Sequence, residues 1–270
     1  MSSERPASRA SWWRAPLARL AGWREQRALE RRAIPDDLWA LTVARLPFVA
    51  RLAEDDRDAL RRMCSLFLDE KYFVGTGGQP VTDDVALAIA AQACLPVLHL
   101  GLHYYGKVTR IVVHPDELIK AIEEVDEDGV VHEYDTSMTG QLDANGILAL
   151  NWVDIINTAE AAEDAYNVVI HEFVHAIDAA TGEIDGVPPL PDQAAREHWM
   201  EVIDGAYETF CDMVDAGLDT VVDPYGAEAV DEFFPVAVEA FFVDPIAFRR
   251  EWPQLYVLFA DYFRQDPAPN

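Results

Sequence analysis

The chain has 270 residues, 50% of which are hydrophobic, and it carries a formal net charge of −27 at pH 7. A chain of this length and composition can bury a sizeable core, either as one large domain or as two small ones. The net charge argues against nucleic acid and anionic membranes as general partners, because phosphate binding needs clustered Lys and Arg. No stretch reaches the roughly 20 uncharged apolar residues of a membrane span, so we expect no integral membrane segment.

The beginning of the chain has the opposite charge balance, because arginines outnumber glutamates there. One interpretation is an arm that binds a membrane surface or a partner, with Trp12, Trp13 and Trp23 as interfacial anchors. The other is a loosely docked terminus, which is common at chain ends. We expect residues 1–31 to form a basic, flexible arm and residues 32–268 to form a single domain.

The expected compartment follows from the absence of export signals. A secretory signal needs an uninterrupted apolar core of about 7–15 residues, and Arg14 and Arg19 interrupt this one. The cysteines are too few and too irregularly spaced for a disulfide framework or a cysteine-rich metal site. They are Cys64, Cys94 and Cys211. We therefore expect a cytoplasmic protein.

The hydrophobic pattern predicts helices followed by short strands. Helical periodicity is found over residues 36–46, 55–68 and 83–95. β-Branched residues predict a strand over 108–113, and the acidic segment 123–133 is interpreted as a solvated loop or hairpin tip. The mixture of helices and strands indicates the α+β class.

His99 and His103 are spaced as a metal-binding pair on a helix would be, four residues apart. However, no acidic residue accompanies them, and Gly101, a poor helix former, lies between them. We interpret both histidines as packing or hydrogen-bonding residues.

Residues 146–152 have the length and composition of a strand and come shortly before the most informative segment of the chain. In zinc peptidases a strand edge near the metal helix pairs with the substrate backbone. An ordinary buried strand is an equally good interpretation of these residues.

The segment 167–178 places two imidazoles and a carboxylate in an otherwise apolar stretch. On a helix, His171 and His175 project from one face and can hold a single ion. Glu172 is rotated by about 100° from His171 and can reach a water molecule on the open side of that ion. The five-residue pattern His-Glu-x-x-His, the pentad of residues 171–175, also occurs by chance in proteins without metal. However, burying these polar groups is costly unless something coordinates them. We predict one catalytic Zn²⁺.

A catalytic zinc site needs a third protein ligand. The metzincin pattern would place Gly and His where this chain has Asp178 and Thr181, so that class is excluded. The remaining common solution is a glutamate from a later helix. The candidates are Glu183, Glu197, Glu201, Glu208, Glu228, Glu232 and Glu239.

The expected burial differs between two of these candidates, Glu208 and Glu239. Glu208 has a spacing reminiscent of thermolysin, but the apolar residues around it leave it on the solvated face of its helix. Glu239 lies within residues 233–242, which contain no other charge. An unpaired carboxylate there would cost several kcal/mol, so we predict Glu239 as the third ligand.

Two further residues have open roles. Asp178 lies one turn beyond His175 and can either brace a ligand histidine or tie down the loop 185–189. Tyr225 can supply a phenol that stabilises an oxyanion, although a tyrosine in a proline-containing turn is more often structural.

Several separate segments together resemble one known family. They are 32–35, 67–71, 89–96, 167–175, 185–189 and 223–225 leading into 239–242. The chain resembles the Mlc titration factor A family of bacterial zinc-dependent, gluzincin-like peptidases over about residues 32–267. The long Arg/Trp-rich head and the strong acidity depart from the family pattern and leave a repressor partnership open.

The resemblance implies a set of properties. It implies zinc bound by His171, His175 and Glu239, with Glu172 as the catalytic residue, in a mostly helical zincin-like fold with a small sheet beside the metal helix. It further implies a cytosolic enzyme with aminopeptidase-type activity on small substrates. In enteric bacteria, members of the family also bind the glucose repressor Mlc.

We expect peptide hydrolysis by a zinc-activated water with Glu172 as the general base. The alternative is a non-catalytic regulatory protein that sequesters a transcription factor. A zinc hydrolase that does not cleave peptides is a third hypothesis.

Overall fold

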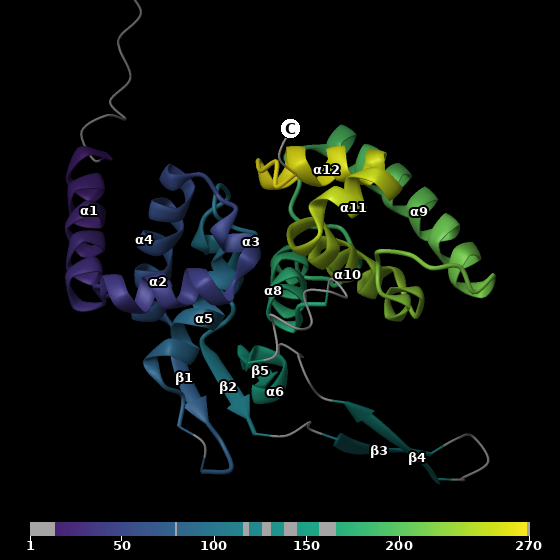
Figure 1. Cartoon of the computed structure of the whole chain (residues 1–270), viewed down its shortest axis with the longest axis horizontal. Coiled ribbons are helices and arrows are strands. Elements are labelled where there is room, and N and C mark those ends of the chain that lie inside the picture. The colour runs from purple at the N-terminus through teal and green to yellow at the C-terminus, as the bar shows by residue number, and fades with distance from the viewer. Residues whose placement is uncertain are drawn as a thin grey trace, which may run out of the picture.

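A computed structural model describes residues 14–78, 80–115, 119–125, 131–137, 145–156 and 166–268. This part of the chain is mostly helical (Figure 1). Its α-helices are α1 (Arg14–Arg31), α2 (Asp36–Arg45), α3 (Pro47–Ala50), α4 (Glu54–Glu70), α5 (Asp83–Cys94), α6 (Trp152–Ile156), α8 (Val168–Asp178), α9 (Gln193–Asp215), α10 (Val230–Val243), α11 (Pro245–Glu251) and α12 (Pro253–Phe263). Short 3-10 helices are η1 (Leu102–Tyr105), η3 (Ala179–Thr181) and η4 (Pro224–Ala227). The helices predicted over 36–46, 55–68 and 83–95 are confirmed as α2, α4 and α5.

The main sheet is parallel, with the order β1 (Tyr72–Gly75), β2 (Arg110–His114) and β5 (Ile147–Asn151). Alternate residues such as Ile111 and Leu148 pair across the sheet and are buried, as expected for strands with one face in the core. The strands predicted over 108–113 and 146–152 are confirmed as β2 and β5. Since β5 is an edge strand of this sheet and contacts α8, the small sheet lies beside the helix that carries the two histidines.

A separate antiparallel hairpin consists of β3 (Ile119–Val125) and β4 (Val131–Ser137). Its last pair joins Val125 and Val131. The acidic segment 123–133 therefore covers the ends of two paired strands, and its tip lies outside the described residues.

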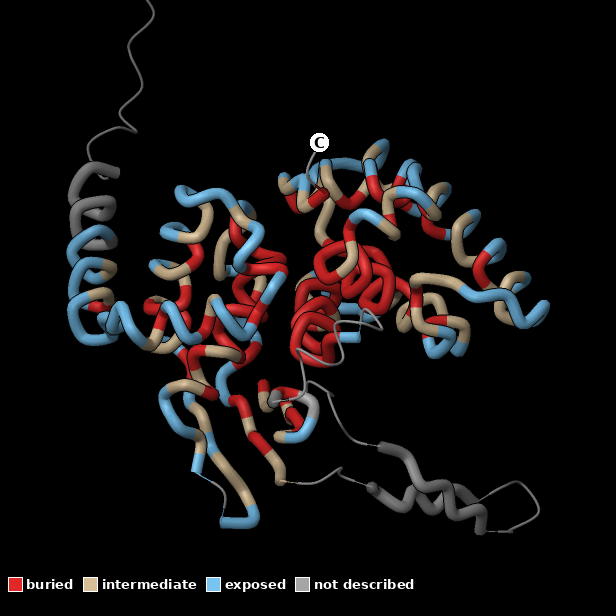
Figure 2. Tube along the Cα trace, viewed as in Figure 1, coloured by how far each residue is buried: buried red, intermediate tan, exposed pale blue. Residues whose placement is uncertain are grey.

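The core is centred on α8 and α10, which pack against each other and are the most completely buried helices in Figure 2. Every residue of α10 from Phe233 to Val243 is buried. Aromatic rings fill the space around α10, with Phe241 in contact with Phe259 and Phe263 of α12. Each such ring contributes roughly 1.5–3 kcal/mol by burial. This packing fixes α10 relative to α8, and the candidate site lies between the two helices.

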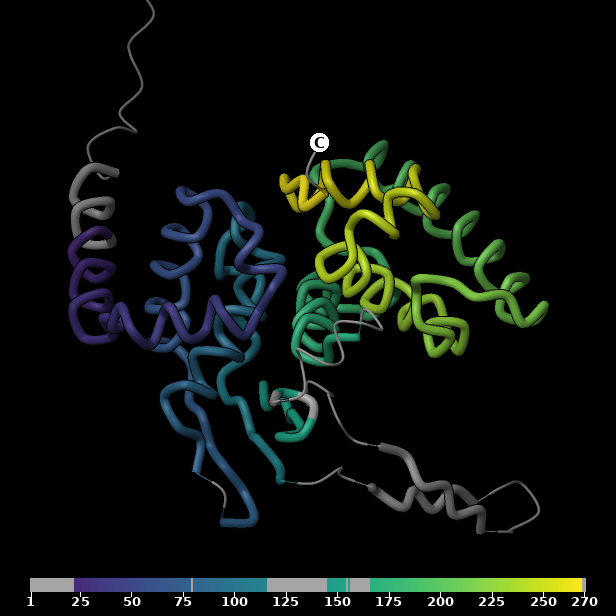
Figure 3. Tube along the Cα trace, viewed as in Figure 1, coloured from purple at the N-terminus to yellow at the C-terminus, as the bar shows by residue number. Residues whose placement is uncertain are grey.

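Parts of the chain that come before α8 in sequence and parts that come after it lie on different sides of this helix (Figure 3). The first helices and strands lie on one side, and α9 to α12 lie on the other. Within the described residues, no helix is both long and apolar enough to cross a membrane.

Most of the segment that we expected to be an arm is helical, because α1 begins at residue 14. Ion pairs join α1 to α4, between Arg31 and Asp69 at 2.7 Å and between Glu25 and Arg62 at 2.5 Å. Residues 1–13 lie outside the described part, and the domain boundary at residue 32 stays a prediction.

Candidate metal centre

The metal helix begins where a side chain caps it. The Oδ1 atom of Asn167 accepts a hydrogen bond from the backbone N–H of Ile170 at 2.9 Å, which satisfies a donor at the start of α8. The Asn167 amide also donates to Gln92 of α5 at 2.9 Å. These buried contacts fix the start and rotation of α8. His171 and His175 then lie on one face, as predicted, with ring centroids 4.8 Å apart.

Three side chains bring donor atoms together at this face. The Nε2 atoms of His171 and His175 are 3.1 Å apart. The Oε2 atom of Glu232, from the first turn of α10, lies 3.2 Å from the first of these nitrogens and 3.4 Å from the second. Among the described residues, these three form the group of potential metal ligands. Two imidazoles and a carboxylate are a common ligand set for catalytic zinc.

Glu239 lies on the other side of the His171 ring. Its Oε1 atom is 2.8 Å from Nδ1 of His171, and its Oε2 atom accepts a hydrogen bond from the backbone N–H of Asn167. The predicted third ligand therefore contacts the ring nitrogen that faces away from His175. The geometry favours Glu232 for the ligand position and leaves Glu239 as the partner of His171.

Both carboxylates come from one face of α10, because they are seven residues apart and two helical turns span about the same number. We predicted Glu239 from the sequence because residues 233–242 contain no other charge, and Glu239 is buried in the structure, at 2% exposure. Glu232 was one of the seven candidates, and it follows Asp231 in the first turn of α10, where acidic residues are common for reasons other than metal binding. Its spacing of seven from Glu239 is the signal that could have found it.

The histidines and carboxylates of the centre shift the pKa values of His171 and Glu232. Burial opposes the charged form of His171, but hydrogen bonds to Glu232 and Glu239 outweigh it and raise the pKa of His171 to about 10. Burial likewise opposes the ionised form of Glu232, yet the hydrogen bonds to His171 and His175 lower its pKa below the ordinary range. Two carboxylates thus favour a positive charge at the His171 imidazole. A divalent cation satisfies the same preference.

Glu172 is buried beside these groups, at 4% exposure. Burial raises its pKa well above the ordinary value, and the charges of Glu232 and Glu239 add to the effect while His171 opposes it. Its Oε2 atom has no hydrogen-bond partner among the described residues. A buried carboxylate oxygen without a partner indicates a place for a water molecule or a substrate group.

Tyr225 lies at the same site, with its ring centroid 6.1 Å from that of His171. The Asp223 carboxylate accepts a hydrogen bond from the Tyr225 backbone N–H at 2.8 Å, which fixes the turn at the start of η4. The side chain is 46% exposed. Burial and the charges of Glu232 and Glu228 raise the pKa of Tyr225 to about 12. The phenol is therefore a hydrogen-bond donor at neutral pH.

The remaining polar residues named from the sequence lie elsewhere. Asp178 accepts a hydrogen bond from the Gly186 backbone N–H at 2.8 Å, so it ties down the loop, as one of its two interpretations had it. Glu208 is exposed on α9. His99 pairs with Asp56 at 3.3 Å, and the His103 ring contacts the neighbouring tyrosine ring at a tilt, with centroids 4.5 Å apart.

Known proteins resemble this chain over most of its length. The model of a family described as glucose-regulated metallo-peptidase M90 matches residues 20–264. The chain is 36% identical over 251 residues to uncharacterized protein slr2042 of Synechocystis sp., covering 92% of this chain and 90% of that protein. It is 32% identical over 232 residues to Mlc titration factor A of Klebsiella pneumoniae, covering 85% and 86%. The protein of the same name from Escherichia coli is 29% identical over 248 residues, covering 91% of each chain. These matches confirm the resemblance found in the sequence.

Proposed function

Because this chain belongs to the glucose-regulated metallo-peptidase M90 family, we propose that it is a zinc-dependent peptidase with His171, His175 and Glu232 as its metal ligands. The observation that carries the proposal is the convergence of two Nε2 atoms and one carboxylate oxygen between α8 and α10.

The spacing of these atoms fits a zinc ion. In a tetrahedral zinc site with bonds of about 2.0–2.1 Å, neighbouring ligand atoms lie roughly 3.3 Å apart. The three separations here are 3.1, 3.2 and 3.4 Å. The neighbouring carboxylates also supply the negative charge that a divalent cation requires. When bound, zinc supplies a Lewis acid that polarises a carbonyl group and acidifies a water molecule.

Glu172 is proposed as the general base. It follows the first ligand in sequence, is buried, and has an oxygen atom without a protein partner among the described residues. It takes a proton from the attacking water and passes it to the nitrogen of the leaving amine. The water oxygen forms a bond to the acyl carbon and the C–N bond breaks, so that one water proton ends on the leaving amine and the other on the new carboxyl group.

Tyr225 is proposed to donate its phenol hydrogen to the oxyanion that develops on the scissile carbonyl. Its position near His171 and its partial exposure place it where a substrate can reach it. The raised pKa keeps the hydrogen on the phenol while the negative charge develops.

Glu239 is proposed as a positioning residue and not as a ligand. A carboxylate at Nδ1 keeps the hydrogen on that nitrogen and leaves the Nε2 lone pair of His171 free for a cation. Its second oxygen holds the first turn of α8, so one side chain orients both the ring and the helix that carries it.

A gluzincin-type assignment, with a zincin-like fold, agrees with this ligand set and with the small sheet beside α8. Under it, β5, the last strand in the order of the described sheet, pairs with the backbone of a peptide substrate. Aminopeptidase-type specificity and a cytoplasmic location belong to the same proposal. They rest on the family resemblance.

A regulatory role is the second candidate, because relatives carry the name Mlc titration factor A. In that case the chain binds a transcriptional repressor. The two roles are compatible in one chain. The experiment that separates them is a peptidase assay on the purified protein with and without a zinc chelator, together with its zinc content by elemental analysis. A peptidase shows cleavage that the chelator abolishes and zinc restores, whereas a pure binding protein shows none.

A further inference from the structure

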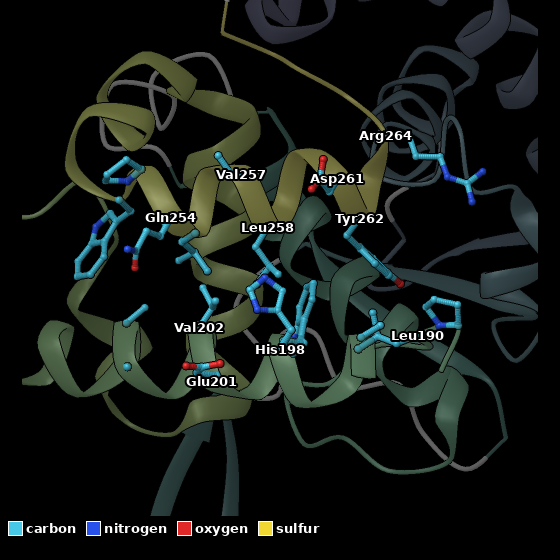
Figure 4. Close-up of a pocket in the computed structure, with 18 of the residues that line it drawn as sticks. Leu190, His198, Glu201, Val202, Gln254, Val257, Leu258, Asp261, Tyr262 and Arg264 are labelled. Carbon is cyan, nitrogen blue, oxygen red and sulfur yellow. The ribbon is translucent and has the colours of Figure 1, made fainter. Parts of the chain in front are cut away.

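A second concave surface lies away from the metal centre, between α9 and α12 (Figure 4). We call it the α9–α12 groove. Its volume is about 1320 Å³, which exceeds the ~300–1,000 Å³ of ordinary small-molecule pockets. The side chains of Val202 and Leu258 lie between the two helices, and Val257, the neighbour of Leu258 on α12, also lines the groove. Val257 is 58% exposed, so apolar surface in this groove faces solvent.

A glycine in the middle of α9 opens this groove further. Gly205 lines it, and a Cβ added at that position would meet no atom within 4 Å. Glycine inside a helix costs about 1 kcal/mol relative to alanine. Local packing within the described residues does not require it. A missing side chain beside open space lets another backbone approach α9 closely.

Both rims of the groove carry acidic side chains, and Arg264 lines it near one end. Exposed carboxylates recur along α9 at intervals of three and four residues, which places them on one helical face. They are Glu197, Glu201, Asp204, Glu208, Asp212 and Asp215. Glu201 is the member that lines the groove, and Asp261 of α12 lies on the opposite rim.

We propose that the α9–α12 groove binds a basic amphipathic helix of another protein. Apolar side chains of that helix, spaced at i, i+3, i+4 and i+7, lie on the floor, and its Lys and Arg residues face the two acidic rims. The α12 wall has 11 residues, so it matches a partner helix of about three turns. The inference does not depend on zinc or on peptidase activity.

The basic head of this chain is a less suitable occupant. The described chain begins at Arg14, in α1, which lies at the opposite end of the molecule from α9 (Figure 1). In addition, α1 is already held on α4 by ion pairs. An external helix is therefore the occupant that the arrangement favours.

The test uses the full chain in the presence of a chelator and a fluorescent synthetic peptide of about 15 residues. The peptide carries Leu and Trp along one helical face and Lys and Arg elsewhere. A scrambled peptide of the same composition lacks the apolar face. Fluorescence anisotropy should show roughly tenfold tighter binding of the patterned peptide, weakened by salt because the rims are charged. Equal binding of both peptides, or binding of neither, would overturn the proposal.

Two variants locate the site. Gly205→Leu fills the groove while improving helix propensity, and Asp261→Arg reverses the charge on a rim. Each should weaken binding of the patterned peptide by roughly fivefold or more. The matched controls are Gly22→Leu, an exposed glycine of α1 that also has open space, and Asp58→Arg on α4. Both controls should bind as the unmodified chain does.

Circular dichroism confirms that each variant is folded before binding is compared. Wild-type affinity in Gly205→Leu would show that the peptide binds elsewhere. Deletion of residues 1–13 tests whether the chain's own head, and not another protein, occupies the groove. A large gain in affinity upon this deletion would identify the chain's own head as the natural occupant and overturn the assignment to another protein.

Discussion

The Nδ1 atom of His171 lies 2.8 Å from the carboxylate of Glu239, and the Nε2 atom of the same ring lies 3.2 Å from the carboxylate of Glu232. One imidazole is therefore held between two carboxylates of the same helix. Because a single ring has two distinct nitrogens, the two carboxylates have different roles. We propose that Glu239 orients the ring and that Glu232 shares the metal position.

Glu172→Gln should keep the metal and lose turnover. The amide retains the size of the side chain but cannot accept a proton from water. We expect kcat to fall by roughly 10²–10⁴-fold, with zinc content by elemental analysis unchanged. Normal cleavage of peptides by this variant would contradict the role of Glu172 as the base.

Glu232 and Glu239 should respond differently to substitution. Removing an outer partner of a ligand typically costs about 10–100-fold in metal affinity. We expect Glu239→Ala to fall in this range and Glu239→Gln to recover part of the loss, since an amide oxygen still accepts from Nδ1–H. Glu232→Ala removes a ligand, so it should lose more affinity, and Glu232→Gln should not recover it.

Competition with a chromophoric chelator measures the zinc affinity of the two Glu239 variants and of the two Glu232 variants. Glu228→Ala, at an exposed position just before α10, is the matched control and should keep wild-type affinity. If Glu239→Gln lost zinc as completely as Glu239→Ala, the carboxylate would be a ligand and the positioning role would be wrong.

Tyr225→Phe should lower kcat while leaving KM and zinc content almost unchanged. Loss of one donor to a developing oxyanion costs about 10²–10³-fold in kcat in other enzymes. The half-exposed position of Tyr225 favours the lower end of this range. Steady-state kinetics on a peptide substrate provide the measurement. An equal kcat in the variant and the wild type would leave the tyrosine with a role in the turn only.

Asp178 should make folding stability depend on pH. Burial raises the pKa of its carboxyl from 3.8 to about 6, although the hydrogen bond from Gly186 opposes the shift. The protonated form is therefore favoured in the folded state. The stability that it provides is complete below pH ~4 and is lost as pH rises through about 6.

Asp178→Asn removes this titration. Between pH 4 and 7 the free energy of unfolding of the wild type should fall relative to this variant by roughly 2 kcal/mol. Urea titrations with a chelator present at each pH provide the comparison. The exposed Asp58→Asn variant should follow the wild type throughout. Parallel curves for wild type and Asp178→Asn would contradict the raised pKa.

Local patterns predicted most of the elements that position the site. The periodicity over 83–95 and 36–46 and the β-branched run over 108–113 correspond to α5, α2 and β2, because these segments bury one face or are buried throughout. The pentad placed His171 and His175 on one face of a helix, since the spacing of four is fixed by helix geometry alone.

The choice between Glu232 and Glu239 as the proposed third ligand required tertiary information. A carboxylate in a stretch without other charges is expected to be buried, and this correctly predicted the burial of Glu239. The same pattern cannot tell which nitrogen of a histidine ring the carboxylate contacts. That choice depends on how α10 packs against α8. The α9–α12 groove had no sequence signal either, because each of its walls alone has the pattern of an ordinary amphipathic helix.

The most direct measurement is a crystal structure of the zinc-loaded protein with anomalous diffraction at the zinc edge. The account predicts one ion within about 2.0–2.2 Å of the Nε2 atoms of His171 and His175 and of a carboxylate oxygen of Glu232. Glu239 should remain hydrogen-bonded to Nδ1 of His171. An ion coordinated by Glu239, or no ion at these histidines, would contradict the account.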